Sequence, residues 1–137
     1  MSASETSSLV REIQSALRSR SDIIVALLFG SLARGSARPD SDVDIAVVAP
    51  GLDRLTLRAE LSAKLGRDVD IVSLDSVASI PLLEEVLRDG IVVHEREAGD
   101  AALFRSHALA TLETDRPWFA RMRDAWLRRV VDKGIGW

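Results

Sequence analysis

The residues best suited to chemistry lie between positions 30 and 44, in the segment GSLARGSARPDSDVD. Gly30 and Ser31 follow a short apolar run, and a glycine there lets a ligand approach the backbone. Backbone N–H groups at the start of a helix, together with the Ser31 hydroxyl, can bind phosphate oxygens. After ten intervening residues come Asp42 and Asp44, whose spacing places both carboxylates on one side of a strand. This combination predicts a site for a nucleoside triphosphate and divalent cations such as Mg²⁺.

A third carboxylate on a neighbouring strand would complete a site for two metal ions. Asp70 lies in the segment Asp68–Leu74, which alternates as a strand with Asp68, Asp70 and Val72 on one face. We predict Asp70 as the third acid, with Asp68 the nearest alternative. Acids gathered on one face repel each other unless cations neutralise them, which strengthens the prediction of a metal site.

The sequence lacks the residues that other phosphate-binding, catalytic or metal-binding motifs require. Gly30 and Gly35 have the glycine spacing of a P-loop, but Ser36-Ala37 stands where the phosphate-binding lysine and its Ser or Thr neighbour are needed. The sequence contains neither G-x-G-x-x-G nor G-x-S-x-G, and it has no cysteine and two histidines. A thiolate or histidine metal centre is therefore excluded, and we interpret His94 as a structural or exposed residue.

Alternating strand and helix patterns should position these residues. They predict an α/β (α+β) domain in which helices pack on a small mixed sheet. Strands are expected at residues 22–29, 42–48, 68–74 and 91–94, and helices at residues 5–19, 31–34, 52–65, 81–88 and 100–113. A last helix is predicted after a cap near Thr114, with an apolar stripe of Phe119, Met122, Trp126 and Val130.

The composition is that of a folded domain outside the membrane. The chain has 137 residues, 47% of them hydrophobic and 28% charged, with a net charge of −3. That charge argues against direct nucleic-acid binding, and the longest apolar run, residues 23–29, is too short to span a bilayer. The polar N-terminus does not resemble a signal peptide, and the absence of cysteine suits a cytoplasmic protein.

The C-terminal part differs chemically from the rest. Residues 116–137 contain six basic residues, two acidic ones and all three tryptophans of the chain. We interpret residues 1–99 as the catalytic domain and residues 100–137 as a helical extension packed on it. Because Trp and Arg are enriched at interface hot spots, the extension is expected to offer a partner-binding surface. The alternative is that its apolar stripe is ordinary core.

The motif resembles a known signature. Gly30-Ser31-Leu32-Ala33-Arg34-Gly35 followed by Ser41-Asp42-Val43-Asp44-Ile45 is similar to the signature of the nucleotidyltransferase superfamily related to polymerase β. The form with Arg34-Gly35 and Ser41 looks like the minimal nucleotidyltransferases, which act as antitoxins beside HEPN-domain RNase toxins. The resemblance covers residues 5–95 and implies a polymerase-β-like fold.

The resemblance also implies a reaction and residue roles. Asp42 and Asp44 would ligate two Mg²⁺ ions, and Asp70 would ligate one metal and take the proton from the attacking hydroxyl. Gly30 and Ser31 would bind the β- and γ-phosphates of ATP, with Arg34 supporting the loop. AMP would pass to a tyrosine of a HEPN toxin, with release of pyrophosphate.

Two alternative functions stay open. Small-molecule adenylyltransferases, such as aminoglycoside-modifying enzymes, share the motif, although they usually need more chain to hold the acceptor. An antitoxin that masks the toxin by binding alone is the other alternative, but it would have no need for three converging acids.

Overall fold

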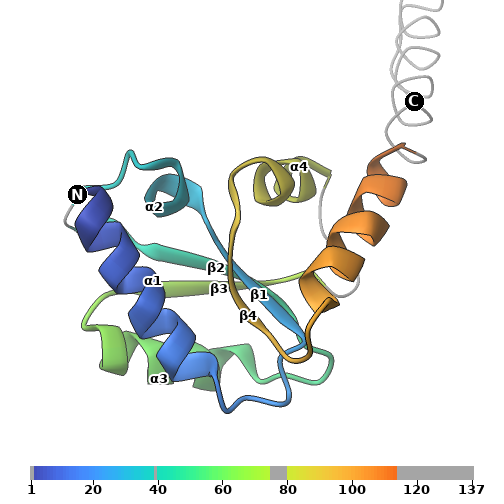
Figure 1. Ribbon diagram of the computed structural model, residues 1–137. Coiled ribbons are helices and arrows are strands. Elements are labelled where there is room, and N and C mark those ends of the chain that lie inside the picture. Colours follow the sequence, from blue (N-terminus) through green and yellow to red (C-terminus); the bar gives the residue numbers. More distant parts are fainter. Residues whose placement is uncertain (1, 39, 75–79, 114–137) are drawn as a thin grey trace, which may run out of the picture.

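The computed structural model describes residues 2–38, 40–74 and 80–113, which form a sheet with helices on both faces (Figure 1). The elements are α1 (Ala3–Leu17), β1 (Val25–Phe29), α2 (Gly30–Arg34), β2 (Val43–Val48), α3 (Arg54–Leu65), β3 (Val69–Ser73), α4 (Ile80–Asp89) and β4 (Ile91–Glu95). Residues 100–113 are helical as well. The predicted elements up to residue 113 are all present, with ends shifted by at most three residues.

The four strands form one mixed sheet in the order β3-β2-β1-β4. β1 pairs antiparallel with both β2 and β4, whereas β2 and β3 are parallel. Parallel neighbours need a crossover connection, and α3 supplies it between β2 and β3. The mixed sheet with flanking helices confirms the predicted fold class.

Local capping explains where α3 begins and ends. The Asp53 carboxylate accepts hydrogen bonds from the backbone N–H groups of Leu55 and Thr56, at 3.1 and 3.2 Å, so the helix starts one residue later. Gly66 ends it in the left-handed conformation at φ +66°, and its N–H donates to the Ser62 carbonyl. β3 follows at Val69 and brings Asp70 back to the sheet.

One face of the sheet is closed by α1 and α3. Side chains from all four strands pack there against both helices and against Leu32 of α2. The fully buried members include Ile13, Leu17, Leu28, Val43, Ile45, Leu57, Leu61 and Val69. We call this side of the sheet the closed face.

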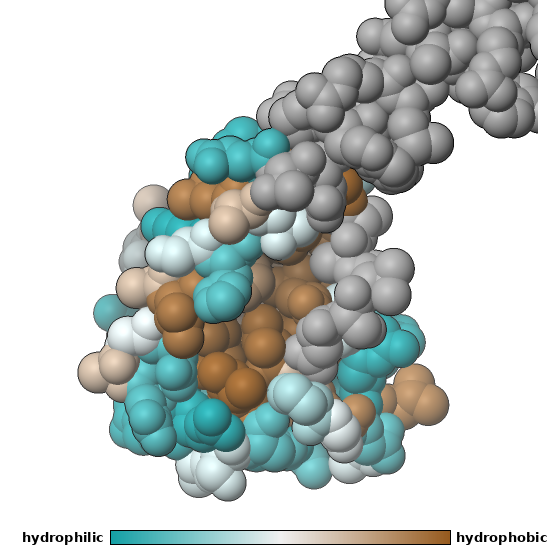
Figure 2. Space-filling view, turned by 90° about the vertical axis from the view of Figure 1, so that its right-hand side faces the viewer, coloured by the Kyte–Doolittle hydropathy of each residue, from teal (hydrophilic) through white to brown (hydrophobic). Residues whose placement is uncertain are grey.

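The other face is covered by α4 and by the helix of residues 100–113, and we call it the site face. Its cluster is smaller, and many of the apolar side chains packed against it are only partly buried: Ile24, Val48, Val72, Leu74, Leu82, Val92, Ala101 and Phe104. Figure 2, which views the molecule from its side, shows apolar side chains gathered in a hollow with a polar rim.

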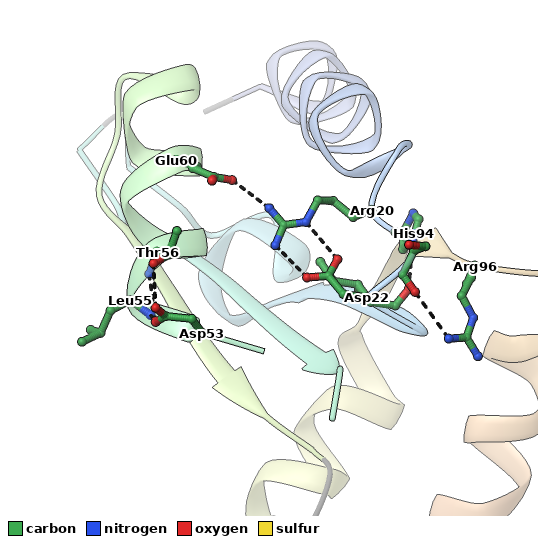
Figure 3. Close-up of polar contacts among 10 residues, drawn as sticks. Arg20, Asp22, Asp53, Leu55, Thr56, Glu60, His94 and Arg96 are labelled. Carbon is green, nitrogen blue, oxygen red and sulfur yellow. Dashed lines mark hydrogen bonds and ion pairs between the residues drawn. The ribbon is translucent and has the colours of Figure 1, made fainter. Parts of the chain in front are cut away.

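Polar contacts join the layers around α1 and α3. Arg20 forms ion pairs with Asp22 at 2.9 Å and with Glu60 of α3 at 2.8 Å (Figure 3). His94 lies with Nε2 3.1 Å from the Ile23 carbonyl oxygen, so it has the structural role that the sequence suggested.

The C-terminal extension is described only in part. Ala101 and Phe104 pack against the site-face cluster and Ala108 is buried, whereas Leu103 and Leu109 are exposed. The predicted stripe from Phe119 to Val130 and the three tryptophans lie outside the described residues. Within residues 2–38, 40–74 and 80–113, no helix combines the length and apolar character needed to cross a membrane.

Candidate active site

Strand pairing brings two of the predicted acids together. In the parallel register of β2 and β3, Asp44 is directly opposite Asp70. Residues directly opposite each other on neighbouring strands share a face, and here it is the face of Ala46 and Val72, the site face. Asp42 is exposed and immediately precedes β2. The sequence predicted Asp42, Asp44 and Asp70 on one face, and the strand register places Asp44 and Asp70 there; for Asp42, which lies outside β2, this stays a prediction.

Asp44 is partly buried and lies among other negative charges. Partial burial raises the pKa of its carboxyl group, and the negative charges of Asp70, Asp42 and Glu85 raise it further. The positive charge of Arg34 opposes this shift and lowers the Asp44 pKa. A bound cation would offset these effects and stabilise the ionised Asp44 carboxylate.

Gly30 lies directly against the Asp44 carboxylate. A Cβ added at Gly30 would overlap Asp44 Oδ2 and would come within 3.2 Å of its Cγ. Gly30 also has φ +76°, a conformation that residues with a side chain rarely adopt. The sequence suggested that glycine gives a ligand access to the backbone; the structure adds that it makes room for the acid. Ser31 follows as the second residue of α2 and is half-buried.

Arg34 and Glu85 form an ion pair beside these acids. Arg34 Nη1 at the end of α2 lies 2.8 Å from Glu85 Oε1 of α4. Both side chains are partly exposed, at 42% and 31%. Sequence patterns predicted Arg34 but not Glu85. Nothing local distinguishes Glu85 from Glu84 beside it, because only the packing of α4 on the site face turns one of them toward Arg34.

The acids suit a divalent cation that is completed by its substrate. Among the described residues, no three His, Asp or Glu side chains are gathered closely enough to enclose a metal ion by themselves. Mg²⁺, however, is commonly held by one or two carboxylates together with substrate phosphates and water. Asp42, Asp44 and Asp70 offer hard oxygen donors where negative charge already raises the Asp44 pKa. Their chemistry therefore fits the predicted ions.

Comparison with known proteins gives the family. Residues 11–98 match the family described as "Polymerase beta, Nucleotidyltransferase", which is more than half of the chain. The chain therefore belongs to the polymerase β nucleotidyltransferases. A curated relative, the protein adenylyltransferase MntA of Shewanella oneidensis, is 37% identical over 67 residues. That alignment covers 46% of this chain and 48% of MntA, so it spans about half of the relative.

Solved structures resemble the chain over more of its length. A crystal structure of a toxin–antitoxin with AMP-PNP superimposes with a TM-score of 0.71 at 29% identity, and the match covers 86% of this chain and 98% of the other. A structure of a tri-AMPylated HEPN toxin of Shewanella oneidensis in complex with an MNT antitoxin matches with a TM-score of 0.61 at 25% identity. This second match covers 89% of this chain and 95% of the other.

Proposed function

We propose that this chain is an antitoxin that transfers AMP from ATP to a hydroxyl group, the phenol of a tyrosine, on a cognate HEPN RNase toxin and so neutralises it. The observation that carries the proposal is Asp44 opposite Asp70 in parallel strands, with Gly30 leaving room for the Asp44 carboxylate. The relative named a protein adenylyltransferase and the similar toxin–antitoxin structures, one with a tri-AMPylated toxin, support the choice of reaction and partner.

Each residue has a proposed role in the transfer. Asp42, Asp44 and Asp70 would hold two Mg²⁺ ions, which would supply charge neutralisation for the triphosphate when bound. Gly30 and Ser31 would receive the β- and γ-phosphates at the start of α2. Arg34, held by Glu85, would support the same loop. The extension of residues 100–137 would add a surface for the toxin beside the catalytic domain of residues 1–99.

The reaction balances as an in-line displacement. The acceptor oxygen forms a bond to the α-phosphorus of ATP while the bond from that phosphorus to the bridging oxygen breaks. Pyrophosphate leaves with the bonding electron pair. The proton of the acceptor hydroxyl passes to the Asp70 carboxylate, which acts as general base.

The decisive experiment measures which molecule receives the labelled AMP. The protein is co-expressed with a HEPN RNase toxin, and the purified complex is incubated with Mg²⁺ and ATP labelled at the α-phosphate. We expect label on the partner, and a loss of about 10²- to 10⁴-fold in rate for Asp70→Asn, the usual contribution of a general base. Label only on this chain or on an added aminoglycoside would contradict the proposal. A tight complex without any label would favour an antitoxin that acts by binding alone.

A further inference from the structure

The three acids are held in place by different means. Asp44 and Asp70 lie inside β2 and β3 and face each other through the strand register. Asp42 precedes β2, which begins at Val43, and its side chain is exposed. The sheet ladder therefore starts one residue too late to hold Asp42 itself.

A side chain from the connection between α3 and β3 reaches this point. Arg67 Nη2 donates a hydrogen bond of 2.7 Å to the carbonyl oxygen of Ser41, in a partly buried position. That carbonyl belongs to the peptide group that joins Ser41 to Asp42. A hydrogen bond from a guanidinium is charge-assisted and directional, so it restrains the orientation of this peptide plane.

Further contacts hold the backbone on both sides of Asp42. The Ser41 hydroxyl accepts a hydrogen bond of 2.8 Å from the Arg38 N–H, and the Ser41 N–H donates one of 3.0 Å to the Arg38 carbonyl. On the other side, the Val43 N–H donates to the Asp68 carbonyl at 2.9 Å. These bonds close a local turn and begin the strand pairing. The Arg67 bond is a side-chain link between this turn and the connection that precedes β3.

We propose that Arg67 is a positioning residue for Asp42: its hydrogen bond to the Ser41 carbonyl fixes the peptide group from which the Asp42 carboxylate is presented to the metal–nucleotide complex. This inference rests on the proposed function, since it assigns Asp42 to that complex. Partners that orient metal ligands typically contribute 10- to 100-fold to metal affinity or activity.

The surroundings of Arg67 allow its effect on metal binding to be measured separately from its effect on the stability of the fold. The side chain borders a cavity of about 400 Å³ that is lined largely by polar residues, namely Asp40, Ser41, Ser62, Gly66 and Asp68. A methionine at position 67 would keep much of the aliphatic stem and remove every donor. The substitution Arg67→Met therefore removes the hydrogen bond without emptying an apolar core.

The test compares Arg67→Met and Arg67→Lys with wild type, with Arg58→Ala as a control on the exposed surface of α3. The readouts are calorimetric titration of Mn²⁺ in the presence of AMP-PNP, urea unfolding in EDTA, and transfer of labelled AMP. For Arg67→Met we expect Mn²⁺ affinity to fall by about 10- to 100-fold, with an unfolding midpoint close to that of Arg58→Ala. Arg67→Lys, which keeps a donor, should recover part of the affinity.

Asp42→Asn in the same titration separates the two proposals. If Arg67→Met binds Mn²⁺ with AMP-PNP as tightly as wild type while Asp42→Asn does not, the positioning role is wrong and the proposed function stands. If Asp42→Asn transfers AMP like wild type, the proposed function itself fails. Loss of the cooperative unfolding transition in Arg67→Met would make Arg67 a structural residue and would also overturn the inference.

Discussion

The two faces of the sheet differ in how completely they are covered. The closed face carries Val43, Ile45, Val69 and Ile71, which lie beneath α1 and α3 with at most 6% of their surface exposed. The site face of the same two strands carries acids beside a smaller and less covered apolar cluster. Strands alternate their side chains between faces, so Asp44 and Asp70 each have deeply buried neighbours along the chain. The closed face thereby holds rigid the backbone from which the acids project.

In the described part of the chain, an arginine ion pair joins distant segments beside each face. Arg20 pairs with Asp22 and with Glu60 of α3 (Figure 3), whereas Arg34 pairs with Glu85 next to Asp44. The two networks are similar in geometry and partial exposure, but only Arg34 lies near enough to affect the Asp44 pKa. Similar ion pairs should therefore matter for stability on one face and for nucleotide binding on the other.

The largest effect is expected from Asp44→Asn on the site face. We expect AMP transfer to fall by about a thousandfold or more, because metal-assisted stabilisation is worth several kcal/mol and each 1.36 kcal/mol is tenfold in rate. The labelled-ATP assay measures this. Wild-type activity in Asp44→Asn would show that the acids of the site face do not take part in AMP transfer.

The same variant should not lose stability in the absence of metal. Since the folded state raises the Asp44 pKa, the ionised carboxylate lowers the free energy of unfolding above that pKa, and this cost disappears as the pH falls through it. In EDTA, Asp44→Asn should be at least as stable as wild type at pH 7, and the difference should shrink toward acidic pH. Urea unfolding at several pH values checks both points.

On the closed face, Ile45→Ala should act in the opposite way. Ile45 is fully buried, so its truncation should lower the free energy of unfolding by about 2–5 kcal/mol. Leu55→Ala, at a side chain that is 74% exposed on α3, is the control and should change it by less than about 0.5 kcal/mol. Urea unfolding measures both variants. If Ile45→Ala lowered the free energy of unfolding as little as Leu55→Ala does, Ile45 would not be part of a tightly packed core and the description of this face would be wrong.

Two glycines give a matched comparison at the site itself. Gly30 and Gly35 have φ +76° and +75°, so alanine at either position should cost about 1–2 kcal/mol of stability. Only at Gly30 would the added Cβ meet another side chain, that of Asp44; at Gly35 nothing lies within 4 Å. We expect Gly30→Ala alone to lose AMP transfer far beyond its loss of stability. Equal activities of the two variants would contradict a role for the Gly30–Asp44 contact.

The smallest effects should come from the two ion pairs. Glu60→Gln and Glu85→Gln should each lower the free energy of unfolding by at most about 1 kcal/mol, as is usual for partly exposed pairs. Nucleotide affinity, measured by titration with AMP-PNP and Mg²⁺, should change only for Glu85→Gln. An equal change in Glu60→Gln would show that the effect is not specific to the site face.

Much of the site was predictable because it depends on local patterns. Alternation predicted a strand that carries Asp44, now β2, and the glycine–serine pair after an apolar run predicted a turn into a helix, now α2. Capping residues such as Asp53 and Gly66 set the ends of α3 to within two residues of prediction. These features depend on neighbouring residues, so the sequence by itself determined them.

The tertiary structure decided what depends on residues far apart in the chain. Four contacts at the site join separate parts of the chain. They are the register that sets Asp44 opposite Asp70, the contact of Gly30 with Asp44, the ion pair of Glu85 with Arg34, and the hydrogen bond from Arg67 to the Ser41 carbonyl. Sequence patterns could propose Asp70 as the third acid, but Asp68 shared its face and remained an alternative. A one-residue change of register would turn Asp70 to the closed face. Burial of Val69 and Ile71 beneath α3 prevents this, and only the folded core supplies that constraint.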